Sequence, residues 1–193
     1  ARTAMDLGRG RSLPDALVAM DGAARCLLAS RLANSERALR LGTAPESALA
    51  EVHTELRDAY AEVWSWPGTR VLRHALDLLD PRSESPFESW SRGYLLQSGL
   101  PAFEVNAPLR GASGRLYYGD FVWRRARVVG EADGMAKYGL TALDQRRALQ
   151  RQRAREDDLA ADGWRTVRWA TGDSASALTS RVRHALAQAR VTA

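Results

Sequence analysis

The chain has 193 residues, of which 45% are hydrophobic and 26% are charged. This composition excludes a wholly disordered chain, and no run of about eighteen apolar residues is present to form a membrane-spanning helix. The 28 basic residues exceed the 23 acidic ones by five. A net charge of +5 is compatible with binding nucleic acid but does not establish it.

Cysteine content and the first residues indicate the setting of the chain. The single cysteine, Cys26, excludes an internal disulfide and a multi-cysteine zinc site, so we expect a reducing, cytoplasmic environment. The chain begins with Ala1, and no charged-then-apolar leader follows. We therefore expect a processed chain or a fragment of a longer protein, without a secretory signal.

Residues 1–80 are predicted to be helical throughout. Ser12 is a typical N-cap with Pro14 just behind it, and apolar residues then recur at helical spacing. Similar stripes predict helices over 45–63 and 71–79, and the first stripe predicts Cys26 to be buried. We interpret 1–80 as a separate helical region, which is a fragment of, or linker from, an upstream module.

A different pattern begins at residue 81. Proline and serine at 85–86 open a helix that ends at Gly99, and three strand-like runs follow over 103–109, 116–123 and 126–133. Their short links predict an antiparallel meander. A helix over 142–161 then leads to a strand over 164–169 and a helix over 175–189. The crossover helix predicts parallel third and fourth strands, so we expect an α/β fold with a mixed sheet.

Three carboxylates fall on the predicted second and third strands. Asp120 lies in an otherwise apolar row, and Glu131 and Asp133 share a face about 7 Å apart along their strand. Inward-facing acids need compensation, and a divalent cation such as Mg²⁺ or Mn²⁺ would provide it. Lys137 is placed to reach back over the acids, and Glu88 is placed to add a fourth acid.

Each of these residues also has a simpler interpretation. Asp120 fits a solvent-facing strand end, and 131–134 fits a polar strand exit into an Asp-Gly turn. Lys137 fits a solvated loop. The metal-site hypothesis requires the three carboxylates to converge, and it fails if arginines already neutralise them.

Taken together, these residues resemble the PD-(D/E)XK nuclease superfamily, and within it the very-short-patch-repair (Vsr)-like endonuclease domains. The resemblance covers about residues 83–190. It is carried by four short pieces in order: Ser85-Pro86-Phe87-Glu88 with Arg92, Gly119-Asp120-Phe121-Val122-Trp123, Glu131-Ala132-Asp133-Gly134 with Lys137, and 153–159 with Gly163-Trp164-Arg165.

The resemblance implies a restriction-endonuclease-like αβββαβ core over 81–193 and Mg²⁺- or Mn²⁺-dependent hydrolysis of DNA. It implies a catalytic set of Glu88, Asp120, Glu131, Asp133 and Lys137, with Asp120, Glu131 and Asp133 as metal ligands. The chain departs from the superfamily where a lysine is expected two residues after the motif acid, because Asp133 stands there. Cleavage itself is therefore open.

DNA is the expected partner, and no membrane association is expected. The arginines expected to contact nucleic acid are Arg92, Arg146, Arg147, Arg151 and Arg155, although a mixed-charge helix is also typical of a solvated face.

Two functions stay open: a metal-dependent DNA endonuclease in defence, repair or mobile-element biology, and a non-cleaving DNA-binding or regulatory protein. In the resembling branch, such domains often follow a module similar to AbiEi-type antitoxins, which suggests a toxin–antitoxin pair. Residues 1–80 have a further expected role in packing on a partner or forming a homodimer.

Overall fold

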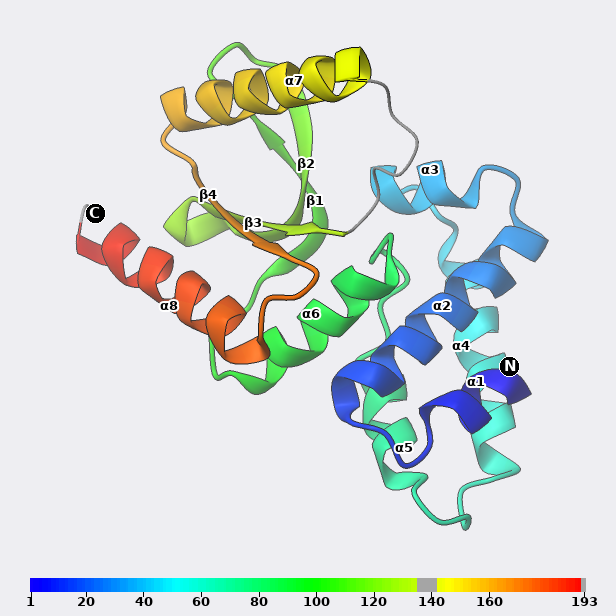
Figure 1. Ribbon diagram of the computed structural model, residues 1–193. Helices are drawn as coiled ribbons and strands as arrows, with labels where there is room; N and C mark the ends of the chain where they lie inside the picture. Colours follow the sequence, from blue (N-terminus) through cyan, green and yellow to red (C-terminus); the bar gives the residue numbers. More distant parts are fainter. Residues whose placement is uncertain (135–141, 192–193) are drawn as a thin grey trace. The chain divides into compact units, whose positions relative to one another are not determined.

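The computed structural model describes residues 1–134 and 142–191 (Figure 1). The chain forms two compact units, Ala1–Ser98 and Gly99–Ala193, which are described separately here. None of the helices in the described residues has the length and apolar character needed to cross a bilayer.

The first unit is entirely helical, as the sequence predicts. The N-cap serines Ser12 and Ser85 each accept a backbone N–H three residues along the chain, and each has a proline in the first turn. A short helix that the apolar pattern did not indicate begins after Asn34, which adopts a left-handed conformation. The six helices are α1 (Arg2–Gly8), α2 (Leu13–Arg31), α3 (Ser35–Leu41), α4 (Glu46–Ala61), α5 (Arg70–Asp77) and α6 (Pro86–Gln97).

Helix α6 belongs to this helical unit, so the division falls between Ser98 and Gly99 rather than between residues 80 and 81. The reason is close packing of α6 on α2. A Cβ atom on Gly93 would lie 2.5 Å from Cα of Pro14, so only glycine permits this approach. Deeper in the same interface, Arg92 donates from Nη2 to both carboxylate oxygens of Asp21 at 2.8 Å.

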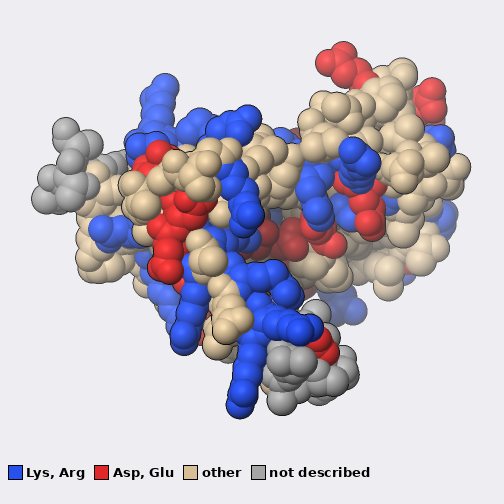
Figure 2. All heavy atoms as spheres, turned by 90° about the horizontal axis from the view of Figure 1, so that it is seen from above, with Lys and Arg blue, Asp and Glu red and all other residues tan. Residues whose placement is uncertain are grey.

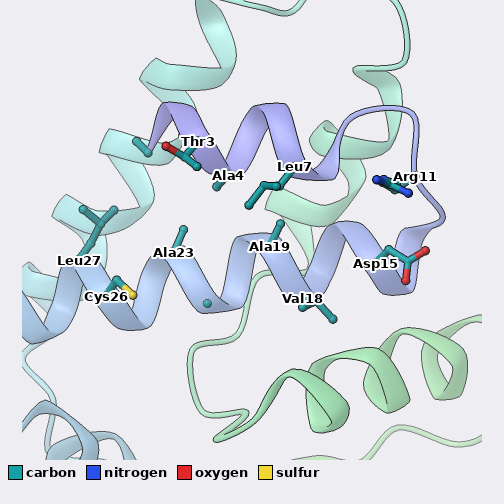
Figure 3. A pocket seen from close by; sticks show the side chains of 12 residues that line it. Thr3, Ala4, Leu7, Arg11, Asp15, Val18, Ala19, Ala23, Cys26 and Leu27 are labelled. Atoms are coloured by element: carbon teal, nitrogen blue, oxygen red, sulfur yellow. The ribbon is translucent and has the colours of Figure 1, made fainter. Parts of the chain in front are cut away.

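A groove of about 690 Å³ lies beside α1 and α2 in the helical unit. Figure 3 shows small and apolar side chains from both helices along it, among them Leu7, Ala19 and Leu27. Cys26 also lines the groove and is exposed. The expectation of a buried thiol is therefore wrong, because Cys26 falls on the solvent side of the α2 stripe.

The second unit is a four-stranded mixed sheet in the order β1-β2-β3-β4. Strands β1 to β3 are antiparallel, and β4 is parallel to β3, which confirms the meander and the crossover predicted from the connections. The elements are β1 (Glu104–Arg110), β2 (Leu116–Trp123), β3 (Val128–Asp133), α7 (Ala142–Ala161), β4 (Arg165–Ala170) and α8 (Ala175–Val191). Strand β3 begins two residues later than predicted, because Arg124–Ala126 forms a 3₁₀ turn and Arg127 is left-handed.

The two helices cover opposite faces of this sheet (Figure 1). On the α7 side, Leu159 and Trp164 pack in one buried cluster with Val122 and Val129. On the other side Trp169 packs against Phe121 with ring centroids 5.5 Å apart. Val129 of β3 faces α7, and alternate residues of a strand share a face, so Glu131 and Asp133 point toward α7 as well.

Candidate functional site

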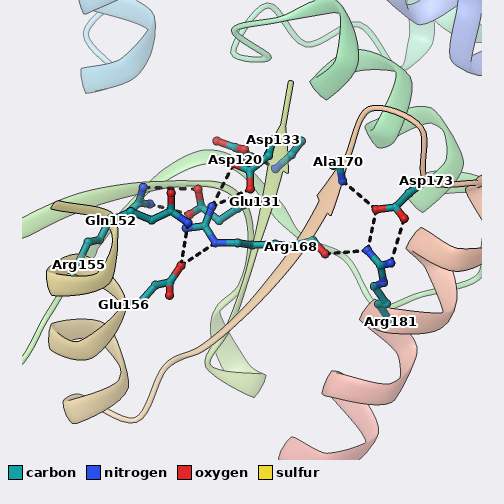
Figure 4. Close-up of polar contacts among 11 residues, drawn as sticks. Asp120, Glu131, Asp133, Gln152, Arg155, Glu156, Arg168, Ala170, Asp173 and Arg181 are labelled. Atoms are coloured by element: carbon teal, nitrogen blue, oxygen red, sulfur yellow. Dashed lines mark hydrogen bonds and ion pairs between the residues drawn. The ribbon is translucent and has the colours of Figure 1, made fainter. Parts of the chain in front are cut away.

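The three predicted acids and two arginines meet on the α7 face of the sheet (Figure 4). Glu131 and Asp133 lie two residues apart on β3, and Asp120 lies on the adjacent strand β2. Arg155 comes from α7, and Arg168 comes from β4, where it pairs in register with Glu131. We call these five residues the acid–arginine cluster.

Glu131 is clamped by Arg155. Arg155 donates from Nη2 to Oε1 of Glu131 at 2.6 Å and from Nη1 to Oε2 at 3.4 Å, and Nη2 also donates to the Tyr118 carbonyl. The side chain of Glu131 is 9% exposed and that of Arg155 is 26% exposed. The carboxylate of Glu131 is therefore largely desolvated, and removing Arg155 leaves it with Arg168 as the remaining nearby positive charge.

Asp133 is held in a similar way by Arg168. Nη1 of Arg168 lies 3.0 Å from each carboxylate oxygen of Asp133, and its Nε donates to Oε1 of Glu156 at 2.7 Å. Burial acts to lower the pKa of Arg168, but the Asp133, Glu131 and Glu156 carboxylates outweigh it, and the pKa lies above its ordinary value. Arg168 therefore stays charged and ties β4 and α7 to β3.

Asp120 has a different partner, the backbone of the neighbouring strand. Its Oδ2 accepts the Ala132 N–H at 2.7 Å. The regular β2–β3 ladder ends at the pair Phe121 and Gly130, so the side chain of Asp120 takes over as acceptor where the ladder stops. The carboxylate of Asp120 is thereby fixed beside Glu131.

A strained residue on β1 lies at the same level of the sheet. Asn106 is buried and has a φ of 44°, in the left-handed region that few residues other than glycine adopt inside a strand. The pairs on either side are Val105 with Phe121 and Ala107 with Gly119, which puts Asn106 opposite Asp120.

This strained position coincides with a change of face along β2. Tyr117 and Val122 pack with the same cluster under α7, although strict alternation would put residues five apart on opposite faces. The apolar row expected around Asp120, made of alternate residues from 116 to 122, is therefore interrupted, and the expectation that they all share one face is wrong. The change allows both the apolar part of β2 and Asp120 to serve the α7 side.

Glu131 carries an electrostatic conflict. Burial and the nearby charge of Asp120 raise its pKa to about 8, although Arg155 and Arg168 act in the opposite direction. Negative charge is therefore crowded at this point of the sheet even with both arginines in place.

The cluster as it stands does not fit a divalent cation. Mg²⁺ requires oxygen ligands at about 2.0–2.1 Å. Both oxygens of Glu131 and both of Asp133 are occupied by guanidinium groups, and Asp120 is bonded to the backbone. Among the described residues, no three His, Cys, Asp or Glu side chains are arranged to hold a metal ion. The acids do converge as predicted, but arginines already compensate them.

Two further residues, Glu88 and Lys137, belong to the predicted catalytic set. Glu88 is in the helical unit, where it accepts from the Ser85 hydroxyl at 2.9 Å and from the Glu84 N–H at 2.6 Å, which is a capping-box arrangement. Lys137 lies outside the described residues. Arg92, predicted to contact nucleic acid, is 4% exposed and bonded to Asp21 and to the Leu78 carbonyl, so its role in the helical unit is structural.

The remaining predicted arginines lie on α7. Arg155 is paired with Glu131. The other three, and Arg153 beside them, are exposed and form no ion pair within the part of the chain that the structure describes. Figure 2 shows basic side chains gathered on the face of the molecule that carries α7. We call these four residues the arginine face of α7: Arg146, Arg147, Arg151 and Arg153.

Charge is unevenly divided between the two units. Gly99–Ala193 contains 16 basic and 10 acidic residues, a net +6, whereas Ala1–Ser98 contains 12 basic and 13 acidic residues, a net −1. The whole basic excess of the chain therefore belongs to the unit that holds the sheet and α7.

Three residues at the site, Arg168, Glu156 and Asn106, are not singled out by the sequence pattern. Arg168 carried a usable signal, because a parallel fourth strand places a residue of 164–169 beside Glu131. Glu156 was interpreted only as part of a mixed-charge helix. For Asn106 the left-handed conformation has no local sequence signal.

Comparison with known proteins gives two relatives and no family. Proteins from two strains of Mycobacterium tuberculosis, each described as an uncharacterized protein, are 26% identical over 167 residues. The match covers 86% of this chain and 52% of each relative, so the chain spans about half the length of the curated relatives it matches. No family model matches, and no solved structure gives a significant match.

Proposed function

We propose that the unit Gly99–Ala193 binds the phosphate backbone of DNA through the arginine face of α7, on a nuclease-like scaffold that does not cleave. The observation that carries this proposal is the set of four accessible arginines on α7 that pair with no described acid. We also propose that the fold of this unit is restriction-endonuclease-like.

Electrostatics supports binding to a polyanion. The unit carries a net +6, and guanidinium groups form paired hydrogen bonds with phosphate oxygens. Arg147 and Arg151 are four residues apart, so they lie on one side of α7 about 6 Å apart along its axis. Such a row neutralises neighbouring phosphates and releases counterions, which makes the binding sensitive to salt and insensitive to sequence.

The fold supports the nuclease-like scaffold. A three-stranded meander, a crossover helix and a parallel fourth strand are the order that the superfamily resemblance implies. Acids occupy its second and third strands, Asp120 on β2 and Glu131 on β3. The guanidinium groups on Glu131 and Asp133 favour binding without cleavage.

A second candidate is a metal-dependent DNA endonuclease using Mg²⁺ or Mn²⁺. The observation in its favour is the raised pKa of Glu131, caused by burial and the charge of Asp120, since crowded negative charge attracts a cation. This activity requires Arg155 to leave Glu131 before an ion can reach the carboxylates.

The test is a fluorescence-anisotropy titration of a labelled DNA duplex with the full chain in EDTA. We expect Arg147→Gln/Arg151→Gln to lose roughly tenfold or more in affinity at about 0.1 M salt. The matched control Arg37→Gln/Arg73→Gln removes two exposed arginines of the helical unit and is expected to change little. Equal affinities for both double variants would overturn the proposed interface.

Cleavage is tested separately by incubating supercoiled plasmid with the chain and Mn²⁺. We expect no nicking above that of the Asp120→Ala variant. Nicking by the wild type that is lost in Asp120→Ala would replace the proposal with the second candidate.

A further inference from the structure

We infer that Arg155 and Arg168 take the place of a divalent cation, so that guanidinium groups rather than a metal ion compensate Glu131 and Asp133 beside Asp120. The inference concerns only the acid–arginine cluster, and it does not depend on whether the protein binds DNA.

The charges match this substitution. Two guanidinium groups bring two positive charges, which is what one divalent ion would bring. Three carboxylates oppose them, which leaves one negative charge in excess. Glu156 adds a fourth carboxylate, which accepts from Nε of Arg168.

The geometry places each arginine where it serves two strands. Arg155 joins Glu131 on β3 to the Tyr118 carbonyl on β2, at the level where the β2–β3 ladder has ended. A metal ion between two strands would bridge them in the same manner. The guanidinium group of Arg155 therefore links β2 to β3 beyond the last pair of the ladder and compensates the charge of Glu131.

The backbone around α7 holds Arg155 in this position. One turn further along α7, Asp158 accepts from the Ser113 N–H at 2.8 Å and from the Tyr117 hydroxyl at 2.9 Å. These bonds tie the end of α7 to the β1–β2 turn, and Leu159 is buried beside them. Arg155 therefore approaches Glu131 from an anchored helix, which reduces the entropy cost of ordering its side chain.

Arg168 is held just as firmly. It lies on β4 in register with Glu131, so its Cα position is fixed by the parallel ladder. Its guanidinium then spans from Asp133 to Glu156 on α7. Both positive groups are thus built into elements of the fold, and displacing them requires α7 or β4 to give way.

The test measures binding of Mn²⁺ to the full chain by electron paramagnetic resonance and isothermal calorimetry. We expect the wild type to show no stoichiometric site below about 1 mM, and its melting temperature to be the same in 10 mM Mg²⁺ as in EDTA. A single tight site, or a melting temperature raised by Mg²⁺ but not by equal ionic strength of NaCl, would overturn the inference.

Removing the arginines should restore a cation site. We expect Arg155→Gln/Arg168→Gln to bind Mn²⁺ at least tenfold more tightly than the wild type, and the additional change Asp120→Asn to abolish the gain. A folded double variant without any gain contradicts the inference. If the double variant does not fold, the single variant Arg168→Gln, which leaves the Arg155–Glu131 pair in place, gives the same comparison.

Discussion

The ion pair between Glu131 and Arg155 allows a quantitative test of the cluster. Two unit charges about 4 Å apart attract by about 4 kcal/mol at the effective dielectric constant of a protein site. A double-mutant cycle cancels the desolvation cost of each side chain, because that cost is the same with and without the partner. Above about pH 8, where Glu131 is ionised, we therefore expect a coupling energy of about 2–4 kcal/mol between the two side chains.

The coupling is measured by a double-mutant cycle of Glu131→Gln, Arg155→Gln and the double variant. Amide hydrogen exchange along β3 reports the free energy of opening the sheet itself, without contribution from the helical unit. Each single variant should lower the free energy of opening. We expect the sum of these two losses to exceed the loss in the double variant, and the difference is the coupling energy.

A matched cycle on Arg127 and Asp162, an exposed pair at 2.9 Å with side chains 53% and 37% exposed, should give less than about 0.5 kcal/mol. Equal coupling in the two cycles, or additivity within about 0.5 kcal/mol at Glu131 and Arg155, would refute the reasoning.

Three further predictions follow from the described residues. Burial and the charge of Asp120 raise the pKa of Glu131 from 4.5 to about 8, so between these pH values the native state holds a proton that the unfolded state has released. The free energy of unfolding should therefore fall by up to ~1.4 kcal/mol for each unit by which the pH rises in this range. Urea titrations should show this slope in the wild type and lose it in Glu131→Gln. Asn106→Ala should be less stable than Asn106→Gly by about 1 kcal/mol, since both remove the amide but only alanine keeps a Cβ at a φ of 44°, and the reverse order in urea melts would contradict a strained backbone. Gly93→Ala should lower the free energy of unfolding by about 1–3 kcal/mol, because its Cβ would lie 2.5 Å from Cα of Pro14. The control Gly22→Ala, whose Cβ would meet nothing within 4 Å, should stabilise α2. Equal melting temperatures of the two variants would argue against the close contact of α6 and α2.

Local pattern predicted much of the second unit. The bounds of β2 and α7 agree with the expected 116–123 and 142–161, because turn residues and helical or alternating periodicity mark both ends. Strand order also placed Asp120 next to the strand of Glu131 and Asp133, whereas their convergence depended on a register that the sequence did not give.

Features that depend on tertiary packing were not predictable in this way. The division of the chain moved to Ser98 because Gly93 lets α6 approach α2, and no local signal announces that contact. The pairing of Arg155 with Glu131 joins residues 24 apart, and α7 arginines that bind acids look the same in sequence as those that face solvent. The left-handed Asn106 likewise reflects the sheet around it rather than its neighbours in the chain.

The central claim, that α7 binds the DNA backbone through its arginines without a metal ion, is tested most directly by the salt dependence of DNA affinity in EDTA. A plot of log affinity against log salt concentration should be steep for the wild type. It should be shallower by about 1.8 for Arg147→Gln/Arg151→Gln, because each lost phosphate contact removes about 0.9 from the slope. An unchanged slope, or binding that appears only when Mg²⁺ is added, would contradict the account.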